Sequence, residues 1–347
     1  MIDSPKDVRP GEEIDLARLR PWLTAQGLEG DLEVEQFPRG HSNLTYLLRL
    51  GRREFVLRRP PFGSKVKGAH DMSREVRILT RVEPYYPQAP RVVASCEDDA
   101  VLGGPFYLME RIRGLILRGP ALKVALPPPG VRALCESFVD GLASLHAIDW
   151  RAAGIEGRPE GYVQRQVEGW TRRWHEAKTD EVPEVDEIAA WLAARIPAES
   201  AGVLIHNDYK YDNLVLDADE PTRIRGVLDW EMATVGDPLM DLGTALGYWV
   251  EAGDDDALKS FAFGPTFAPG SLTREGLAAL YGQRTGRDVS NMLFYVCFAL
   301  FKTAVVAQQI YARYKQGLTK DERFASFIFG VQLLAKQALM RAESGRV

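Results

Sequence analysis

Cysteine is scarce in this chain of 347 residues, which has only three, Cys96, Cys135 and Cys297. Because they lie far apart and are odd in number, they argue against a disulfide framework and favour a reducing compartment. The N-terminal segment "MIDSPKDVRPGEEIDLARL" also lacks the apolar run of a secretory signal. The sequence therefore predicts a cytoplasmic protein.

An excess of positive charge is also missing. Lysine and arginine total 43 against 48 aspartates and glutamates, which gives a formal net charge of −5. A net negative charge does not favour a general nucleic-acid-binding surface, so we expect no nucleic-acid partner. The most apolar stretch, residues 292–306, is interrupted by Lys302 and is shorter than the roughly 20 residues of a membrane span. We expect a buried helix there and no membrane association.

Two common nucleotide-binding motifs are absent as well. The chain contains neither the G-x-x-x-x-G-K-[ST] of P-loop proteins nor the G-x-G-x-x-G of dinucleotide-binding folds. Four of the five histidines, His41, His70, His146 and His175, show no metal-ligand spacing. A zinc site is therefore not expected.

The first 112 residues are mostly strand. Residues 15–26 repeat leucines at helical spacing between the cap Asp15 and Gly27. The period then changes to two, and "LEVEQF", residues 45–50 and "EFVLRR" predict a three-stranded meander. A helix with Met72 and Leu79 on one face follows, and "RVVASC" and "FYLMERI" supply two more strands.

From Val131 onward the pattern is mainly helical, as in "LCESFVDGLASLHAI" and "EIAAWLAARI". We predict an α+β fold with a boundary near Arg113 and Gly114. Residues 1–112 would form a β-rich lobe with a leading helix, and residues 113–347 a helical lobe. At this length, one large domain with a small lobe or two domains of ordinary size are both possible.

Charged side chains are concentrated in "VLIHNDYKYDNLVL", residues 203–216. Residues 214–216 and 224–228 read as two strands joined by a polar turn, and an antiparallel hairpin would bring Asn213 and Asp229 to one end. Their oxygens are hard ligands that suit Mg²⁺, which takes further ligands from substrate phosphates. Asp208 lies in the loop that leads to this end and is suited to accept a proton or orient a hydroxyl. This order of residues fits phosphoryl transfer.

Two segments carry a family resemblance. "HNDYKYDN" has the H-x-D-x-x-x-x-N spacing of the kinase catalytic loop, and "VLDWEMATVGDPLMDLG" resembles the following segment of the aminoglycoside phosphotransferase and choline kinase family. Within that family, "LDWE", "GDP" and "DLG" are most similar to the kinase-like domains associated with acyl-CoA dehydrogenases.

The resemblance implies a bilobal protein-kinase-like fold that uses ATP and Mg²⁺ to phosphorylate a hydroxyl of a small molecule. It implies that Asp208 is the catalytic residue, that Asn213 and Asp229 hold the metal, and that Lys210 reaches the transferred phosphoryl group. The N-terminal lobe would bind the nucleotide, and the helical lobe would carry the catalytic loop and the acceptor site. The domain association suggests a hydroxy acid or a hydroxyacyl-CoA as acceptor.

Glu75 tests this idea independently, because it falls on the apolar stripe of its helix between Met72 and Leu79. A carboxylate there points inward and needs a cation. Arg58 occupies the place of the strand lysine that pairs with a helix glutamate in kinase-like folds. Arginine can make the ion pair, but its planar fork differs from a compact ammonium at a phosphate.

Two further segments are assigned to the nucleotide by their position. The turn "FPRGHSNLTYLL" lies where kinases fold a phosphate-covering loop, although it has a single glycine, Gly40, with Ser42 and Asn43 as possible donors. An ordinary hairpin turn is an equal interpretation of this segment. "LMERIRG" resembles the hinge between lobes, with Met109 behind adenine and the backbone of Glu110 and Ile112 pairing with it.

Other charged groups have structural interpretations. We expect His206 to hold the catalytic loop in shape, Asp212 to cap it, and Asp241 to bind its backbone. The acidic stretch "EAGDDDALKS", residues 251–260, could attract a cationic substrate or simply form a solvated loop with helix caps. Three alternatives to a small-molecule kinase remain: a nucleotide-binding pseudokinase, a metal-dependent hydrolase and a protein kinase.

Overall fold

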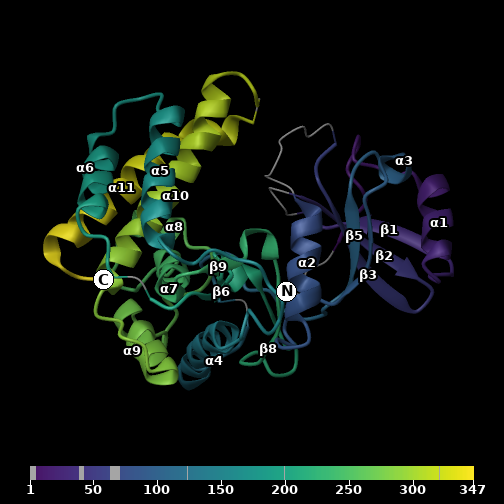
Figure 1. The fold of residues 1–347 in the computed structure, drawn as a ribbon, viewed down its shortest axis with the longest axis horizontal. Helices are drawn as coiled ribbons and strands as arrows, with labels where there is room; N and C mark the ends of the chain where they lie inside the picture. The colour runs from purple at the N-terminus through teal and green to yellow at the C-terminus, as the bar shows by residue number, and fades with distance from the viewer. Residues whose placement is uncertain (1–4, 39–42, 63–70, 123, 199, 320) are drawn as a thin grey trace. The chain divides into compact units, whose positions relative to one another are not determined.

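The computed structural model describes residues 5–38, 43–62, 71–122, 124–198, 200–319 and 321–347 (Figure 1). The chain divides into two compact units, each assembled from separate stretches of sequence. Unit 1 comprises Met1–Ile116, Ala153–Ile155 and Asn213–Ala233, and unit 2 comprises Leu117–Ala152, Glu156–Asp212 and Thr234–Val347. The sequence prediction followed chain order and placed residues 213–233 in the helical lobe, whereas the structure groups them with unit 1.

Unit 1 is built on a five-stranded antiparallel sheet with the strand order β1-β2-β3-β5-β4. The meander and the two later strands predicted from the sequence are confirmed by this sheet. The segment 213–233 adds a two-stranded antiparallel hairpin to the unit. The elements are α1 (Leu16–Ala25), β1 (Leu32–Gln36), β2 (Leu44–Leu50), β3 (Arg53–Arg59), α2 (Met72–Val82), β4 (Val92–Cys96), α3 (Asp99–Leu102), β5 (Phe106–Glu110), β7 (Leu214–Leu216), β8 (Ile224–Val227) and the 3₁₀ turn η2 (Trp230–Met232).

Helices α1 and α2 of this unit form where caps and apolar spacing coincide. Asp15 accepts hydrogen bonds at the start of α1, and Leu19 and Leu23 of that helix enter a core shared with the sheet. Asp71 caps α2 in the same way, and the buried face of α2 includes Glu75 among apolar residues. The predicted inward position of Glu75 is therefore confirmed.

Unit 2 is mainly helical and contains the short antiparallel strand pair of β6 and β9. Its longest helix, α10, packs against α5, α6, α7 and α11 (Figure 1). The elements are α4 (Pro128–His146), α5 (Tyr162–Ala177), α6 (Pro183–Ala193), β6 (Val203–Ile205), the turn η1 (Tyr211–Asn213), which ends in unit 1, β9 (Thr234–Gly236), α7 (Pro238–Gly247), α8 (Asp256–Ser260), α9 (Arg274–Thr285), α10 (Met292–Lys315), η3 (Glu322–Ser326) and α11 (Phe327–Ser344).

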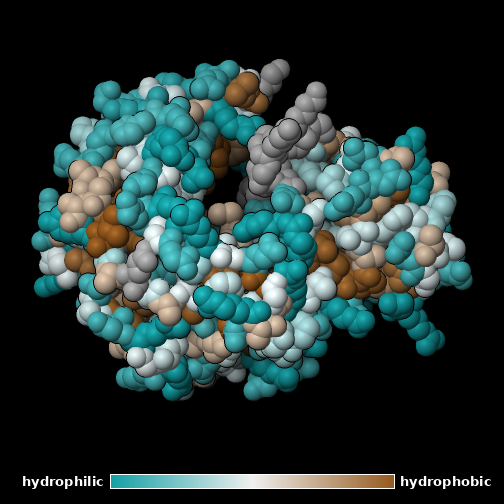
Figure 2. All heavy atoms as spheres, in the orientation of Figure 1, coloured by the Kyte–Doolittle hydropathy of each residue, from teal (hydrophilic) through white to brown (hydrophobic). Residues whose placement is uncertain are grey.

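Helix α10 contains the apolar stretch singled out in the sequence. Within the described residues it is the single helix long and apolar enough to cross a membrane, and 61% of its most apolar window is buried inside the protein. The prediction of a buried helix is confirmed by this packing. On the face shown in Figure 2, hydrophilic residues dominate and hydrophobic ones form smaller areas.

Candidate active site

The loop that carries Asp208 follows β6 in unit 2 and is held by Asp241 of α7. The fully buried Asp241 carboxylate accepts hydrogen bonds from the backbone N–H groups of His206 and Asn207, each at 2.6 Å. It also lies 3.1 Å from Nε2 of His146. Burial raises the pKa of Asp241, but these hydrogen bonds and the neighbouring histidines lower it, and the net shift is downward. The predicted role of Asp241 as a backbone anchor is confirmed.

His206 and Asn207 shape the turn that presents Asp208. Nδ1 of the buried His206 accepts a hydrogen bond of 3.2 Å from the Asp208 backbone N–H, which fits the predicted structural role of this histidine. Asn207 has a φ of 65°, in the left-handed region that non-glycine residues rarely adopt. Its side-chain amide donates to the Tyr162 hydroxyl at 3.2 Å, which helps to fix this turn.

Asp208 is paired with Lys210, whose Nζ lies 3.0 Å from Oδ1 of the aspartate. The lysine ammonium also lies over the rings of Tyr248 and Phe263, at 4.7 Å and 4.9 Å from their centroids. Burial and the charge of Asp208 raise the pKa of Tyr248. The structure thus brings two of the predicted catalytic residues together and surrounds their cation with aromatic rings that the sequence did not single out.

Asp212 lies close to the same lysine, with 4.0 Å between its Oδ1 and Lys210 Nζ. Burial raises the pKa of Asp212 from 3.8 to about 6, although Lys210 lowers it. At mildly acidic pH, Asp212 is therefore partly protonated. It then places less negative charge near Asp208 than a fully ionised aspartate would. Its predicted role as a loop cap remains a prediction.

In unit 1, Arg58 of β3 forms a group of ion pairs. Its guanidinium lies 3.2 Å from Glu75 of α2, 2.9 Å from Asp229 and 3.7 Å from Glu231. Burial raises the pKa of Glu75, and Arg58 opposes that rise. The predicted ion pair between Arg58 and Glu75 is confirmed, whereas its role at a nucleotide remains a prediction. The added contacts with Asp229 and Glu231 use the planar fork that distinguishes arginine from lysine.

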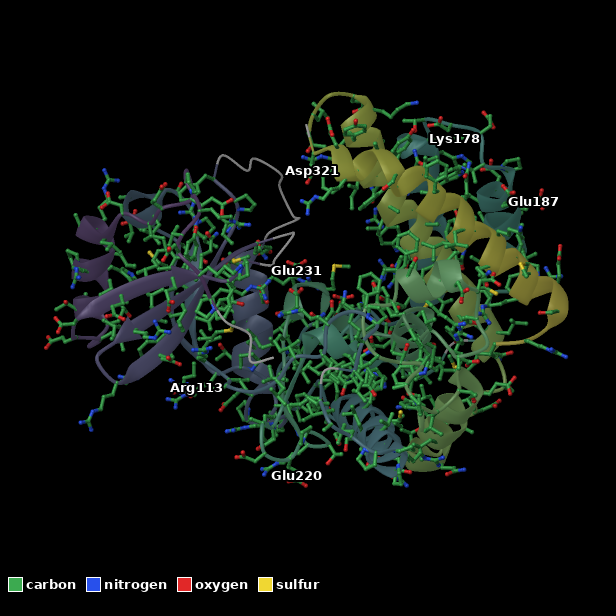
Figure 3. The ribbon with its side chains drawn as sticks, turned by 180° about the vertical axis from the view of Figure 1, so that it is seen from behind. Arg113, Lys178, Glu187, Glu220, Glu231 and Asp321 are labelled. Carbon is green, nitrogen blue, oxygen red and sulfur yellow. The ribbon has the colours of Figure 1, made fainter. Side chains whose placement is uncertain are left out.

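Glu231 extends this group toward the predicted phosphate-covering turn. Its Oε2 accepts a hydrogen bond of 2.8 Å from Nδ2 of Asn43, and its backbone carbonyl accepts one of 2.9 Å from Arg74 of α2. Figure 3 shows Glu231 close to α2. Two of the predicted nucleotide contacts, Gly40 and Ser42, lie outside the described residues.

The hairpin of β7 and β8 confirms the predicted antiparallel pairing, with Leu214 opposite Val227. The N–H of Leu228 donates to the carbonyl of Asn213 at 2.8 Å, so Asn213 lies beside the residue that precedes Asp229. Asp229 has a φ of 68°, again in the left-handed region. A carboxylate and a carboxamide oxygen here form a donor set that fits Mg²⁺, because this ion prefers hard oxygen ligands.

The predicted hinge packs against the same hairpin. Met109 is buried in β5 opposite Val56, whereas the Glu110 side chain is 46% exposed. Ile112 packs against Gly226 of β8. A Cβ at position 226 would lie only 2.6 Å from Cδ1 of Ile112, so a larger residue does not fit there. These contacts place the hinge segment against β8, and its predicted backbone pairing with adenine stays a prediction.

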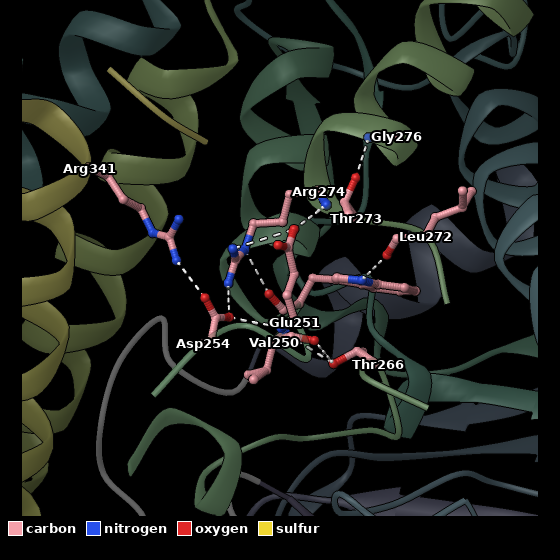
Figure 4. Close-up of polar contacts among 10 residues, drawn as sticks. Val250, Glu251, Asp254, Thr266, Leu272, Thr273, Arg274, Gly276 and Arg341 are labelled. Atoms are coloured by element: carbon pink, nitrogen blue, oxygen red, sulfur yellow. Dashed lines mark hydrogen bonds and ion pairs between the residues drawn. The ribbon is translucent and has the colours of Figure 1, made fainter. Parts of the chain in front are cut away.

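Two acids of the segment that begins at Glu251 are ion-paired with arginines within unit 2 (Figure 4). The buried Arg274, at the start of α9, contacts Glu251 at 3.5 Å and also pairs with Asp254. Arg341 of α11 lies 3.3 Å from the second oxygen of Asp254. These ion pairs offset the charges of Glu251 and Asp254. This favours a structural interpretation for that part of the segment.

Sequence reasoning missed several of these partners. Arg274 and Arg341 carry no local pattern that points to residues 251–254. Lys302 did leave a signal, because it interrupts the apolar stretch of residues 292–306. The structure places its Nζ 3.4 Å from the carbonyl oxygen of Asn207, next to Asp208 in the chain.

Comparisons with known proteins bear on the chemistry of these residues. The model of a family described as the phosphotransferase enzyme family matches residues 33–277. Acyl-CoA dehydrogenase family member 11 of Gallus gallus is 32% identical over 93% of this chain and 42% of its own length. This chain spans less than half the length of the curated relatives it matches.

Solved structures are similar over nearly the whole chain. A proposed aminoglycoside phosphotransferase from Ralstonia eutropha is 30% identical with a TM-score of 0.81, covering 96% of this chain and 99% of that one. A ternary complex of an aminoglycoside phosphotransferase with AMP-PNP and hygromycin B is 18% identical with a TM-score of 0.59, covering 94% and 99% of the two chains. At that identity the second likeness shows the fold alone. The predicted kinase-like α+β fold is confirmed.

Proposed function

We propose, since this chain belongs to the phosphotransferase enzyme family, that it transfers the γ-phosphoryl group of ATP to a hydroxyl of a small molecule. The pair of Asp208 and Lys210, 3.0 Å apart on a backbone held by Asp241, is the observation that carries the proposal. A carboxylate and an ammonium fixed side by side can act on a hydroxyl and on a phosphoryl group respectively.

In the proposed step, the acceptor hydroxyl donates a hydrogen bond to Asp208 and gives up its proton to that carboxylate. The oxygen forms a bond to the γ-phosphorus while the bond from that phosphorus to the bridging oxygen of ADP breaks. Lys210 offsets negative charge on the transferred group. Tyr248 and Phe263 hold the ammonium in place, so little reorganisation is needed as charge develops.

Asn213 and Asp229 would hold Mg²⁺. When bound, this ion would neutralise negative charge on the phosphates. Arg58, fixed by Glu75, would orient the nucleotide phosphates, and Asn43, whose amide donates to Glu231, would contribute a further donor. The hinge backbone at Glu110 and Ile112, in front of the buried Met109, would pair with adenine. Together these residues form the nucleotide-binding site in this proposal.

For the acceptor we propose a hydroxy acid or a hydroxyacyl-CoA. Arg274 and Arg341 pair with Glu251 and Asp254 of the acidic segment, which reduces the negative charge that could bind a polycationic aminoglycoside. Lys210 instead adds positive charge directly beside Asp208. The relatives named for acyl-CoA dehydrogenases support the same class of acceptor.

The decisive experiment incubates the purified chain with ATP and Mg²⁺ and with matched panels of hydroxy acids, hydroxyacyl-CoA thioesters and aminoglycosides. We expect ADP and a phosphorylated product with a member of the first two panels. Asp208→Asn should abolish turnover, whereas Asp256→Asn, at a fully exposed side chain of the same unit, should leave it unchanged. Turnover that survives in Asp208→Asn would contradict the proposed chemistry.

A nucleotide-binding pseudokinase is the second candidate, because Arg58 stands in place of the usual lysine and contacts the proposed metal ligand Asp229. Both candidates predict stabilisation by ATP. Loss of the γ-phosphate distinguishes them, since a pseudokinase would bind ATP and return it unchanged in the presence of every acceptor.

A further inference from the structure

Lys302 is a buried cation in an apolar helix. It lies near the middle of α10, where Phe301, Ala304 and Val305 are buried beside it, and its own exposure is 9%. Burying an ammonium is costly unless other groups compensate for the lost hydration. A position on this helix would be filled more stably by an apolar side chain, so the lysine needs a reason that lies outside packing.

Its surroundings compensate for the charge only in part. Nζ donates to the carbonyl oxygen of Asn207 at 3.4 Å, which is long for a hydrogen bond, and lies 5.9 Å from the ring of Trp170. Burial lowers the pKa of Lys302, Asp208 and Asp241 raise it, and Lys210 and Arg173 lower it further. The net shift of this pKa is downward, and the negative charge of Asp208 opposes it.

The carbonyl that Lys302 binds belongs to the peptide that joins Asn207 to Asp208. The N–H of Asn207 is held by Asp241 at 2.6 Å, and its side chain is held by Tyr162 at 3.2 Å. Lys302 binds the backbone carbonyl of the same residue. Together these contacts stabilise the left-handed conformation of Asn207, whose φ is 65°. Asp208 is the next residue, so this conformation sets the direction of its side chain.

We propose that Lys302 is a positioning residue for Asp208: its ammonium binds the Asn207 carbonyl and thereby fixes the direction of the proposed catalytic carboxylate. This inference rests on the proposed kinase function. It assigns to a core lysine a role in setting the orientation of the general base, with no contact to the acceptor. This role also gives a functional reason for the buried ammonium of Lys302 in the apolar helix α10.

The test compares Lys302→Met, which removes the charge and keeps the length, with Lys302→Arg, which keeps a donor. Lys315→Met is the matched control, because Lys315 lies on the same helix with 45% of its side chain exposed. For Lys302→Met we expect kcat to fall about 10- to 100-fold, with the KM values for ATP and acceptor changed less than about twofold and the melting temperature unchanged or higher. Lys302→Arg should recover part of kcat, and Lys315→Met should match the parent chain.

Hydrogen exchange provides a readout that needs no turnover. A peptide covering residues 204–210 should exchange faster in Lys302→Met than in Lys315→Met. A rise in acceptor KM at constant kcat would instead make Lys302 a substrate contact and overturn the proposal. Unchanged kcat together with unchanged exchange would overturn it as well. If the parent chain phosphorylates no acceptor, the kinase proposal fails, while the exchange result still decides whether Lys302 fixes the loop.

Discussion

Arg58 and Asp229 form an ion pair in unit 1, with 2.9 Å between Nη2 of the guanidinium and Oδ1 of the carboxylate. The same arginine pairs with Glu75, whose side chain is only 1% exposed. One guanidinium thereby links strand β3, helix α2 and the residue that follows the hairpin. A compact ammonium could not hold these separate carboxylates with the same geometry.

Arg58→Met should therefore lower the unfolding free energy by about 3–5 kcal/mol, because it leaves the buried carboxylate of Glu75 without its cation. Arg58→Lys should cost less, since it keeps the charge. Urea denaturation measures both. The double variant Arg58→Met/Glu75→Met should recover much of the loss, and a single Arg58→Met variant as stable as the parent would show that the pair contributes little.

Asp212 should make stability depend on pH. Its pKa in the folded chain is about 6 against 3.8 for the free side chain, so its stabilising contribution is present below about pH 4 and is lost as the pH rises through 6. Asp212→Asn has no ionisable group at this position, so its free energy of unfolding should not fall as the pH rises through 6. We expect the variant to be more stable than the parent above pH 7, by about 1–3 kcal/mol, and equally stable below pH 4.

Thermal or urea unfolding between pH 3.5 and 8 measures this difference. Asp256→Asn, with a fully exposed side chain, is the control and should show no comparable change with pH. An Asp212→Asn variant that is less stable than the parent at pH 8 would mean that attraction to Lys210 outweighs burial.

Gly114 is required by a close approach between chain segments. Leu115 and Leu216 exchange backbone hydrogen bonds of 2.8 Å and 2.7 Å, and a Cβ on Gly114 would lie 2.1 Å from the Leu216 carbonyl oxygen. Gly114→Ala should therefore destabilise unit 1 by about 1–3 kcal/mol, because the backbone must shift. Gly104→Ala is the control, since a Cβ on Gly104 would meet no described atom within 4 Å. Equal melting temperatures for the two variants would contradict this explanation.

Removal of the metal should stop phosphoryl transfer. We expect EDTA to abolish product formation and added Mg²⁺ to restore it. Asp229→Asn should reduce the rate at least about 100-fold and raise the Mg²⁺ concentration needed for half-maximal rate, because metal-assisted charge neutralisation is worth several kcal/mol. Asp219→Asn, in the exposed turn of the same hairpin, should behave as the parent does. Transfer that persists in EDTA would exclude the proposed metal role.

Much of unit 1 could be predicted from local patterns. The meander of β1 to β3 and the helix α2 follow from apolar periodicity, and the caps Asp15 and Asp71 precede their helices by one residue. Glu75 was predictable as a buried acid because it interrupts an apolar stripe. Its partner could be inferred from the resemblance to kinase-like folds, in which a strand cation at the place of Arg58 pairs with a helix glutamate.

The partners in unit 2 were harder to predict. Lys210 lies two residues from Asp208, so their pairing is local, but its contacts with Tyr248 and Phe263 join segments that no period relates. Arg274 neutralises Glu251 from 23 positions away. The sequence showed an acidic segment and left its role open, because net charge in a segment does not reveal which cations pack against it.

By itself, the sequence determined the order of the proposed catalytic and metal-binding residue types, the alternation of strand and helix, and the family to which the chain belongs. These features are local or depend on fixed spacing along the chain. Only the tertiary structure decided the further partners of these charges: Asp229 for Arg58, and the Asn207 carbonyl for Lys302. Such contacts depend on how helices and strands pack, since burial forces distant polar groups to find partners that leave no pattern in the sequence.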